Sequence, residues 1–328
     1  MDEVVFIHYL DEQVAAKEVQ AGKIDAYFWR VPLGVADELK RDPRVRVYQA
    51  PGGSLSLLLN PAPSQKEFNP FTIRDVRFAL NYLINREFIV NEILRGYGAP
   101  MIGVYGQFDP DFLVVSDDVD AAGIRYNPEV ANRIITEALT KVGATKRDGK
   151  WLMNDRPITL KFFIRGDDPN RNALGEALAS ELEKTGFTIS RNFGDLNKAY
   201  DQVYGSDPKM EEWHLYTEGW GRSVFERYDT VTIAQMFAPW YGQMPGFGEP
   251  SYWNYQNKQL DEITQKISTG DFASKEERDQ LLRQANKLGI EEAVRIFIAS
   301  LIEPYVARPD LKGLINDFGA GITGRMSL

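Results

Sequence analysis

The residues best suited to binding chemistry in this sequence are aromatic rings interleaved with glycines between positions 213 and 255. Aromatic side chains make up 12% of the 328 residues, and this stretch concentrates them. Glycine-rich loops cannot form a close-packed helical core, so we expect some of these rings to line a concave surface and others to fill the interior. The rings are Trp213, Tyr216, Trp220, Phe225, Tyr228, Phe237, Trp240, Tyr241, Phe247, Tyr252, Trp253 and Tyr255.

Signatures of catalysis and of metal binding are missing. The chain has no cysteine, and its two histidines, His8 and His214, stand in separate contexts. This composition excludes thiolate catalysis, cysteine-ligated metals and disulfides. The string from Asp118 to Glu129 imitates a calcium loop, but Ala122 occupies a position that needs an oxygen ligand. We therefore expect no metal, no cofactor and, without a nucleophile or phosphate-binding motif, no enzyme.

Charge and length narrow the class of protein further. The formal net charge of −9 repels nucleic-acid phosphates, so we expect no nucleic-acid partner. With 43% apolar and 26% charged residues the composition is that of a soluble globular protein, and 328 residues predict two domains. The chain has no long apolar run and no basic, apolar start, so we expect it to carry neither a signal nor a membrane anchor.

The first sixty residues predict an α/β unit. Apolar runs at 4–9 and 24–29 are β-prone, and between them Asp11 can cap a helix that Gly22 ends. An alternating pattern on both sides of Gly52-Gly53 predicts a hairpin or two neighbouring strands. This order of strand, helix and strand is typical of an α/β sheet.

Helices further along are predicted from capping residues and from apolar positions spaced about 3.6 residues apart. A strand, a helix and another strand between 158 and 189 predict a second α/β lobe. The predicted helices begin at Thr72 (continuing to Gly96), Asn127, Asp168-Pro169, about 257 and Ser274, with Glu277 completing a capping box at the last. The predicted strands cover 158–164, 187–189, 213–218 and 293–299.

Several motifs, in the same order along the chain, resemble the family 5 extracellular solute-binding proteins. These proteins bind oligopeptides, dipeptides or nickel for ABC importers. Residues 21–26, AGKIDA, resemble the family's aGeiDa signature, and residues 70–86, PFTIRDVRFALNYLINR, resemble its long helix motif. Residues 126–131, YNPEVA, resemble the start of its next helix, and Gly219-Trp220 resembles the segment that borders the ligand.

The resemblance implies an α/β fold like that of type II periplasmic binding proteins, with two lobes, mixed sheets, a hinge and an incomplete N-terminal lobe. Residues 1–104 and 296–328 are expected to form the partial first lobe. Residues 105–295 are expected to form the second, ligand-binding lobe. Hinge candidates are 98–126, where no regular period is sustained, and 295–305.

The resemblance also implies a ligand lying against the strand that carries the Gly-Trp pair. Peptide-binding members have an Asp three residues after this Trp, which pairs with the peptide's amino terminus. Ser223 stands there instead, so an acidic or neutral polar ligand group beside Arg222 is favoured. The expected ligand contacts are Trp29, Asn60, Glu218, Gly219, Trp220, Gly221, Arg222 and Trp240.

These expectations describe the substrate-binding component of an ABC-type importer, a monomer that captures a peptide-like or other small polar solute and serves a permease. The full-length protein would be extracellular, on the cell surface or periplasmic. Two alternatives stay open at this stage: a carboxylate-based hydrolase with aromatic subsites, and a protein-interaction module that docks through its aromatic face.

Overall fold

A computed structural model describes residues 3–64, 66–221, 231–241, 244, 255–316 and 321–322. The α-helices are α1 (Glu12–Gln20), α2 (Leu33–Leu39), α3 (Arg74–Leu83), α4 (Arg86–Phe88), α5 (Phe112–Ala121), α6 (Pro128–Lys141), α7 (Pro169–Thr185), α8 (Leu196–Ala199), α9 (Thr232–Phe237), α10 (Lys258–Thr269) and α11 (Lys275–Glu292). Short 3₁₀ or π turns are η1 (Pro70–Thr72), η2 (Ile89–Ile93), η3 (Tyr200–Tyr204), η4 (Pro208–Met210) and η5 (Pro239–Tyr241). Of the helices in the described ranges, none combines the length and the apolar character needed to cross a bilayer.

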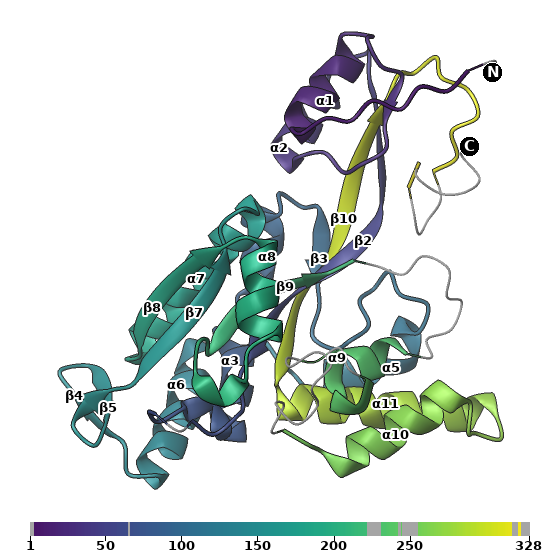
Figure 1. Ribbon diagram of the computed structural model, residues 1–328. Helices are drawn as coiled ribbons and strands as arrows, with labels where there is room; N and C mark the ends of the chain where they lie inside the picture. Colours follow the sequence, from purple (N-terminus) through teal and green to yellow (C-terminus); the bar gives the residue numbers. More distant parts are fainter. Residues whose placement is uncertain are drawn as a thin grey trace.

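One mixed sheet of seven strands organises the molecule (Figure 1). Its order is β1-β10-β2-β9-β7-β8, with β3 also paired to β10. Strands β7, β8 and β9 run parallel to one another, whereas β2 is antiparallel to both β9 and β10. The strands are β1 (Ala26–Tyr27), β2 (Arg46–Leu59), β3 (Gly98–Pro100), β7 (Thr159–Arg165), β8 (Thr188–Gly194), β9 (Leu215–Trp220) and β10 (Arg295–Ala307). A separate small sheet contains β4 (Thr145–Arg147), β5 (Lys150–Met153) and β6 (Arg156–Pro157).

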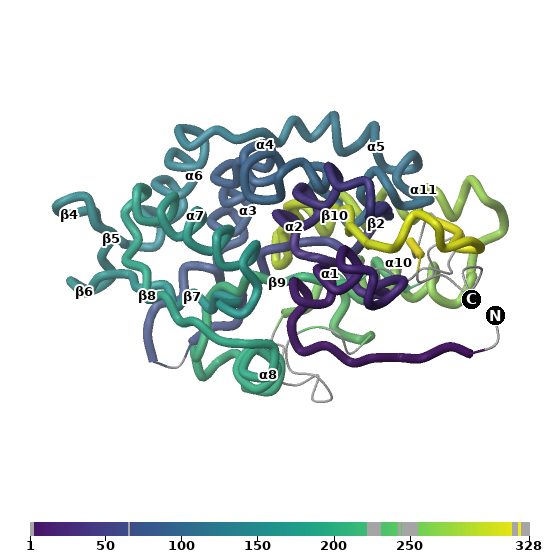
Figure 2. The backbone as a smooth tube through the Cα atoms, turned by 90° about the horizontal axis from the view of Figure 1, so that it is seen from above, coloured from purple at the N-terminus to yellow at the C-terminus, as the bar shows by residue number. Residues whose placement is uncertain are grey.

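The two longest strands, β2 and β10, join a small upper part to a larger lower part (Figure 1). Helices α1 and α2 pack beside their upper ends, where Ala16, Val35 and Leu39 bury a small core against Val306. Seen from above, the described segment before α1 runs along the outside of α1, and the described residues nearest to the two chain ends lie on the same side of the molecule (Figure 2). The paired long strands are therefore the main connection between the two parts.

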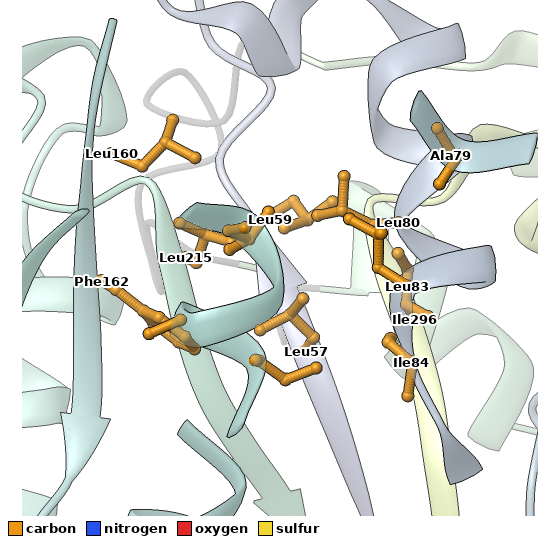
Figure 3. Packing of buried hydrophobic residues seen from close by; sticks show 14 of the residues in the cluster. Leu57, Leu59, Ala79, Leu80, Leu83, Ile84, Leu160, Phe162, Leu215 and Ile296 are labelled. Atoms are coloured by element: carbon orange, nitrogen blue, oxygen red, sulfur yellow. The ribbon is translucent and has the colours of Figure 1, made fainter. Parts of the chain in front are cut away.

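The largest core lies in the lower part, between the sheet and helices α3, α6 and α7. Leu57 and Leu59 of β2 face Leu80 and Leu83 of α3, with Phe162 of β7 on the other side (Figure 3). This core contains residues from both of the lobes predicted from the sequence, 1–104 with 296–328 and 105–295. Core packing therefore does not mark the boundaries at 104 and 296, and the division into those two lobes stays a prediction.

Most of the helix ends that local signals predicted lie where they were expected. Asn127 caps α6 by accepting the amide N–H of Val130, and Pro128 is its first residue. Asp168 caps α7, which ends at Gly186 with a left-handed φ of 109°. These predictions are confirmed because each cap depends only on residues within one turn of the helix end.

Three predictions of local structure were wrong. Residues 4–9 form no strand and are largely exposed, with Phe6 78% accessible. The region around Gly52-Gly53 is not a hairpin but part of the continuous strand β2. Here β9 approaches so closely that a Cβ on Gly53 would overlap the carbonyl oxygen of Trp220. The segment 98–126 also contains a helix, α5.

The helix predicted from Thr72 to Gly96 is interrupted. Its first part, α3, begins at Arg74 without a cap from Thr72 and ends at Leu83, because Ile84 and Asn85 leave the helical conformation. Asn85 then caps α4 by accepting the amide N–H of Phe88. Such local side-chain bonds compete with a continuous helix. Buried Arg86 then donates to the carbonyls of Met101 and Phe297, which ties the second part to β10.

Candidate functional site

The candidate site lies at the carboxyl ends of the parallel strands β7, β8 and β9. In open α/β sheets this edge collects ligand-binding residues, because the loops that follow the strands meet there. Strand β9 pairs with β2 along its length, with Glu218 opposite Ser56 and Trp220 opposite Ser54. Since side chains alternate along a strand, Glu218 and Trp220 share one face and Gly219 belongs to the other.

Glu218 is buried and fully engaged by neighbouring side chains. Its carboxylate accepts Nε and Nη2 of Arg295 at 2.5 and 2.9 Å, Oγ of Ser56 at 2.8 Å, and the hydroxyl of Tyr204. Burial by itself raises the pKa of Glu218, but the adjacent guanidinium and these hydrogen bonds hold that pKa below its ordinary value. A direct contact between this carboxylate and a ligand would require breaking these bonds.

Trp220, at the end of β9, is half-buried. Its ring packs against two hydrophobic clusters, one containing Phe237 and Phe297 and the other containing Tyr204 and Tyr216, and the Arg295 guanidinium carbon lies 5.7 Å from its centroid. Within the described part of the chain, the indole Nε1 has no hydrogen-bond partner. Gly221 follows at the exposed end of the strand. Arg222, the next predicted contact, and Ser223 lie outside the described residues.

Arg171 is a site residue that sequence reasoning missed. It belongs to the first turn of α7, and its guanidinium lies flat against Gly219, where an added Cβ would stand 2.5 Å from Nη2. Its Nε is 3.2 Å from Oδ2 of Asp168 and makes no geometrically sound hydrogen bond to the described residues. The buried Nε is thus ion-paired with Asp168, and donors for a ligand would have to come from the terminal Nη1 and Nη2. One signal in the sequence could have found it: Arg171 lies in the first turn of a predicted helix that follows a predicted strand, and ligand sites in α/β proteins form at such positions.

Trp29, the predicted contact in the upper part, lies on the surface next to a charged pair. Trp29 is 58% exposed, and the neighbouring Arg30 pairs with Glu303 of β10 at 3.3 Å. The pKa of Glu12 is raised, mainly because the carboxyl is partly buried. Arg30 and the Trp29 indole lower this pKa in part, and the negative charge of Asp168 raises it further. Glu12 belongs to α1 of the upper part and Asp168 caps α7 of the lower part, so the charge of one carboxylate influences the other.

The predicted contact Asn60 lies elsewhere in the fold, and Trp240 is bonded to a neighbouring helix. Asn60 is wholly buried, and its backbone amide donates to the carbonyl of His214 at the other end of β9. At about 3.3 Å per residue, that end is roughly 20 Å from Trp220. The indole of Trp240 donates to Oγ1 of Thr264 on α10 at 2.9 Å. The structure thus places Arg171 beside Gly219, on the face of β9 opposite to Glu218 and Trp220, and does not bring Asn60 to this end of the strand.

The aromatic stretch divides as expected between core and surface. Trp213, Tyr216 and Phe237 are buried, whereas Trp220 and Trp240 are partly exposed. Phe225, Tyr228, Phe247, Tyr252 and Trp253 lie outside the described residues. In the described ranges, no three acidic or histidine side chains converge as metal ligands would. A surface cavity of about 290 Å³ lies away from β9, between Phe88, Tyr126 and Glu181.

The fold is that of the type II periplasmic binding proteins, as comparison with solved structures shows. The structure superimposes on the Campylobacter jejuni protein NikZ in complex with Ni(L-His) with a TM-score of 0.74 at 21% identity, covering 98% of this chain and 60% of that one. It matches the Bacillus subtilis oligopeptide-binding protein AppA, in complex with a nonapeptide, with a TM-score of 0.70 at 16% identity, covering 97% and 58%. The predicted fold class is confirmed.

Residues 1–235 match the bacterial extracellular solute-binding proteins, family 5 (middle region), and the chain belongs to this family. Among curated relatives, it is 20% identical over 288 residues to the probable D,D-dipeptide-binding periplasmic protein DdpA of Escherichia coli, covering 87% of this chain and 48% of the relative. It is 21% identical over 335 residues to heme-binding protein A of Haemophilus influenzae, covering 99% and 54%. The chain thus spans about half the length of these relatives.

Proposed function

We propose that this chain is the substrate-binding component of an ABC-type importer, working as a monomer in the periplasm or on the cell surface. It captures a peptide-like or other small polar solute between the upper part and the open end of β9, for delivery to a permease. Family membership and the printed functions of the relatives support this role. The observation that carries it is the close approach of the Arg171 guanidinium to Gly219 near the carboxyl end of β9, with Trp220 on the opposite face of the same strand end.

The arrangement favours a solute with a carboxylate or other anionic group. The Arg171 guanidinium offers planar, paired donors, a geometry that suits carboxylates. Gly221 has no side chain, and nothing lies within 4 Å of where its Cβ would stand, so a ligand can approach the backbone closely there. Trp220 supplies an apolar surface at the same strand end, on the face opposite to Gly219. The expected solute is therefore small and polar, with its anionic group at Arg171.

The test is a thermal-shift panel of dipeptides and tripeptides, each as the free acid and as the C-terminal amide, together with nickel–histidine. A ligand at a hundred times its Kd stabilises the fold by about 2.7 kcal/mol, which raises the melting temperature measurably. We expect free acids to bind and amides to bind at least tenfold more weakly. Mass spectrometry of the bound peptides should show them chemically unchanged, as a binding protein requires.

Arg171→Met should remove the preference for the free acid, with Arg133→Met on the exposed side of α6 as the matched control. Both variants lose one positive charge, so only the position differs. If no member of the panel raises the melting temperature, the proposed function is wrong for this chain. If Arg171→Met keeps the preference for free acids, the assignment of the anionic group to Arg171 is wrong.

A further inference from the structure

Arg295, the first residue of β10, holds four segments together with one guanidinium. Nε and Nη2 donate to both carboxylate oxygens of Glu218 on β9. Nη1 donates to the backbone carbonyl of Met236 on α9 and lies 3.4 Å from the sulfur of Met244. The guanidinium carbon is 5.7 Å from the centroid of the Trp220 ring. A planar group with five donors can make all these contacts at once, which an ammonium cannot.

The partners of this guanidinium are themselves fixed. Glu218 also accepts the hydroxyls of Ser56 on β2 and of Tyr204 on η3. All four residues are buried, with Arg295 only 1% exposed. A buried, bidentate charge pair whose remaining acceptors are satisfied is rigid, because any displacement leaves an uncompensated charge. The guanidinium therefore forms a fixed point under the end of β9.

Trp220 needs such a support because the sheet holds it on one side only. On the β2 side Trp220 pairs with Ser54, but the β7 pairing stops at Leu215 and Tyr216, four residues earlier. Trp220 and Glu218 share a face of β9, so the guanidinium that holds Glu218 also lies against the indole. A cation over an aromatic face is attracted to it, and more strongly where both are shielded from water.

We propose that Arg295 is a positioning residue for the ligand site: it holds the Trp220 ring at the open end of β9 and ties that end to α9. Arg295 itself touches no ligand. The inference rests on the proposed function only in treating Trp220 as a ligand contact. This proposal differs from a purely structural ion pair between Arg295 and Glu218 in what it predicts. Removing both charges should preserve the fold and still displace the Trp220 ring.

The experiment follows the Trp220 ring directly. The chain is labelled with fluorotryptophan, and the Trp220 resonance in the fluorine NMR spectrum is assigned by its loss in Trp220→Phe. The double variant Arg295→Met/Glu218→Met removes both charges together, which avoids a lone buried ion. We expect its Trp220 resonance to shift or split, with a melting temperature above that of Arg295→Met alone.

A matched control is the double variant Arg278→Met/Asp111→Leu. Arg278 and Asp111 form a second buried bidentate pair, at 2.9 and 2.7 Å, between α11 and the residue that precedes α5. Removing this pair should leave the Trp220 resonance unchanged. Arg295→Lys keeps the charge but lacks the planar fork, so it should also shift the resonance and can be measured even if the double variant fails to fold.

An unshifted Trp220 resonance in the folded Arg295 variants would overturn the proposal, because Arg295 would then serve only stability. A shift as large in the Arg278/Asp111 control would overturn it too. A peptide found by the thermal-shift panel should bind the Arg295→Met/Glu218→Met variant about tenfold more weakly. If the panel yields no ligand, the proposed function fails, while the fluorine spectra still decide whether Arg295 positions the ring.

Discussion

The buried side chain of Asn60 hydrogen-bonds to backbone groups of three other residues. Its Nδ2 donates to the carbonyls of Pro208 and Trp213 at 2.8 and 3.0 Å, and its Oδ1 accepts the amide of Ala62 at 3.0 Å. Asn60→Ala leaves these buried backbone groups without partners, so we expect the free energy of unfolding to fall by about 2 kcal/mol or more. Urea denaturation measures this loss. Asn132→Ala, which removes one bond within α6, should cost much less; an equal loss would contradict the assignment.

At the scale of elements, the contact between β2 and the end of β9 depends on a missing side chain. A Cβ on Gly53 would overlap the carbonyl oxygen of Trp220, so Gly53→Ala forces the two strands apart. We expect a loss of about 1–3 kcal/mol in urea denaturation, typical of overpacking, and weaker ligand binding. Gly34→Ala in α2, where nothing lies within 4 Å, should be neutral or stabilising. If both variants have the same stability, the strands are not in close contact at Gly53.

At the scale of the whole molecule, the Glu218 pair should make stability depend on pH. The pKa of the Glu218 carboxyl in the folded protein lies below its ordinary value of 4.5. The ion pair with Arg295 therefore stabilises the fold above pH 4.5, and this stabilisation is lost as the pH falls through the folded pKa. Urea denaturation between pH 3 and 6 should therefore show a steeper acid loss for the native chain than for Glu218→Gln. The difference is at most about 1.4 kcal/mol per pH unit, the effect of one proton. Equal slopes would contradict the lowered pKa.

Prediction from the sequence succeeded where the determinants are local. The cap at Asp168 and the stop at Gly186 depend on residues within one helical turn. The Gly219-Trp220 segment was placed by motif resemblance and lies at the carboxyl end of β9. Arg171 was missed because its contact with Gly219 requires β7 and β9 to be neighbours, which no spacing along the chain reveals.

The sequence by itself determined several helix ends, among them those of α6 and α7, most strands of the large sheet and the resemblance to a solute-binding family, because caps, apolar periods and motifs act over short distances. Only the tertiary structure decided which of the predicted contacts meet. It placed Asn60 at the far end of β9, set Arg171 beside Gly219 and put Arg295 beneath Trp220. The physical reason is that sheet order and burial depend on pairings between strands far apart in the chain, and these pairings give each side chain its neighbours.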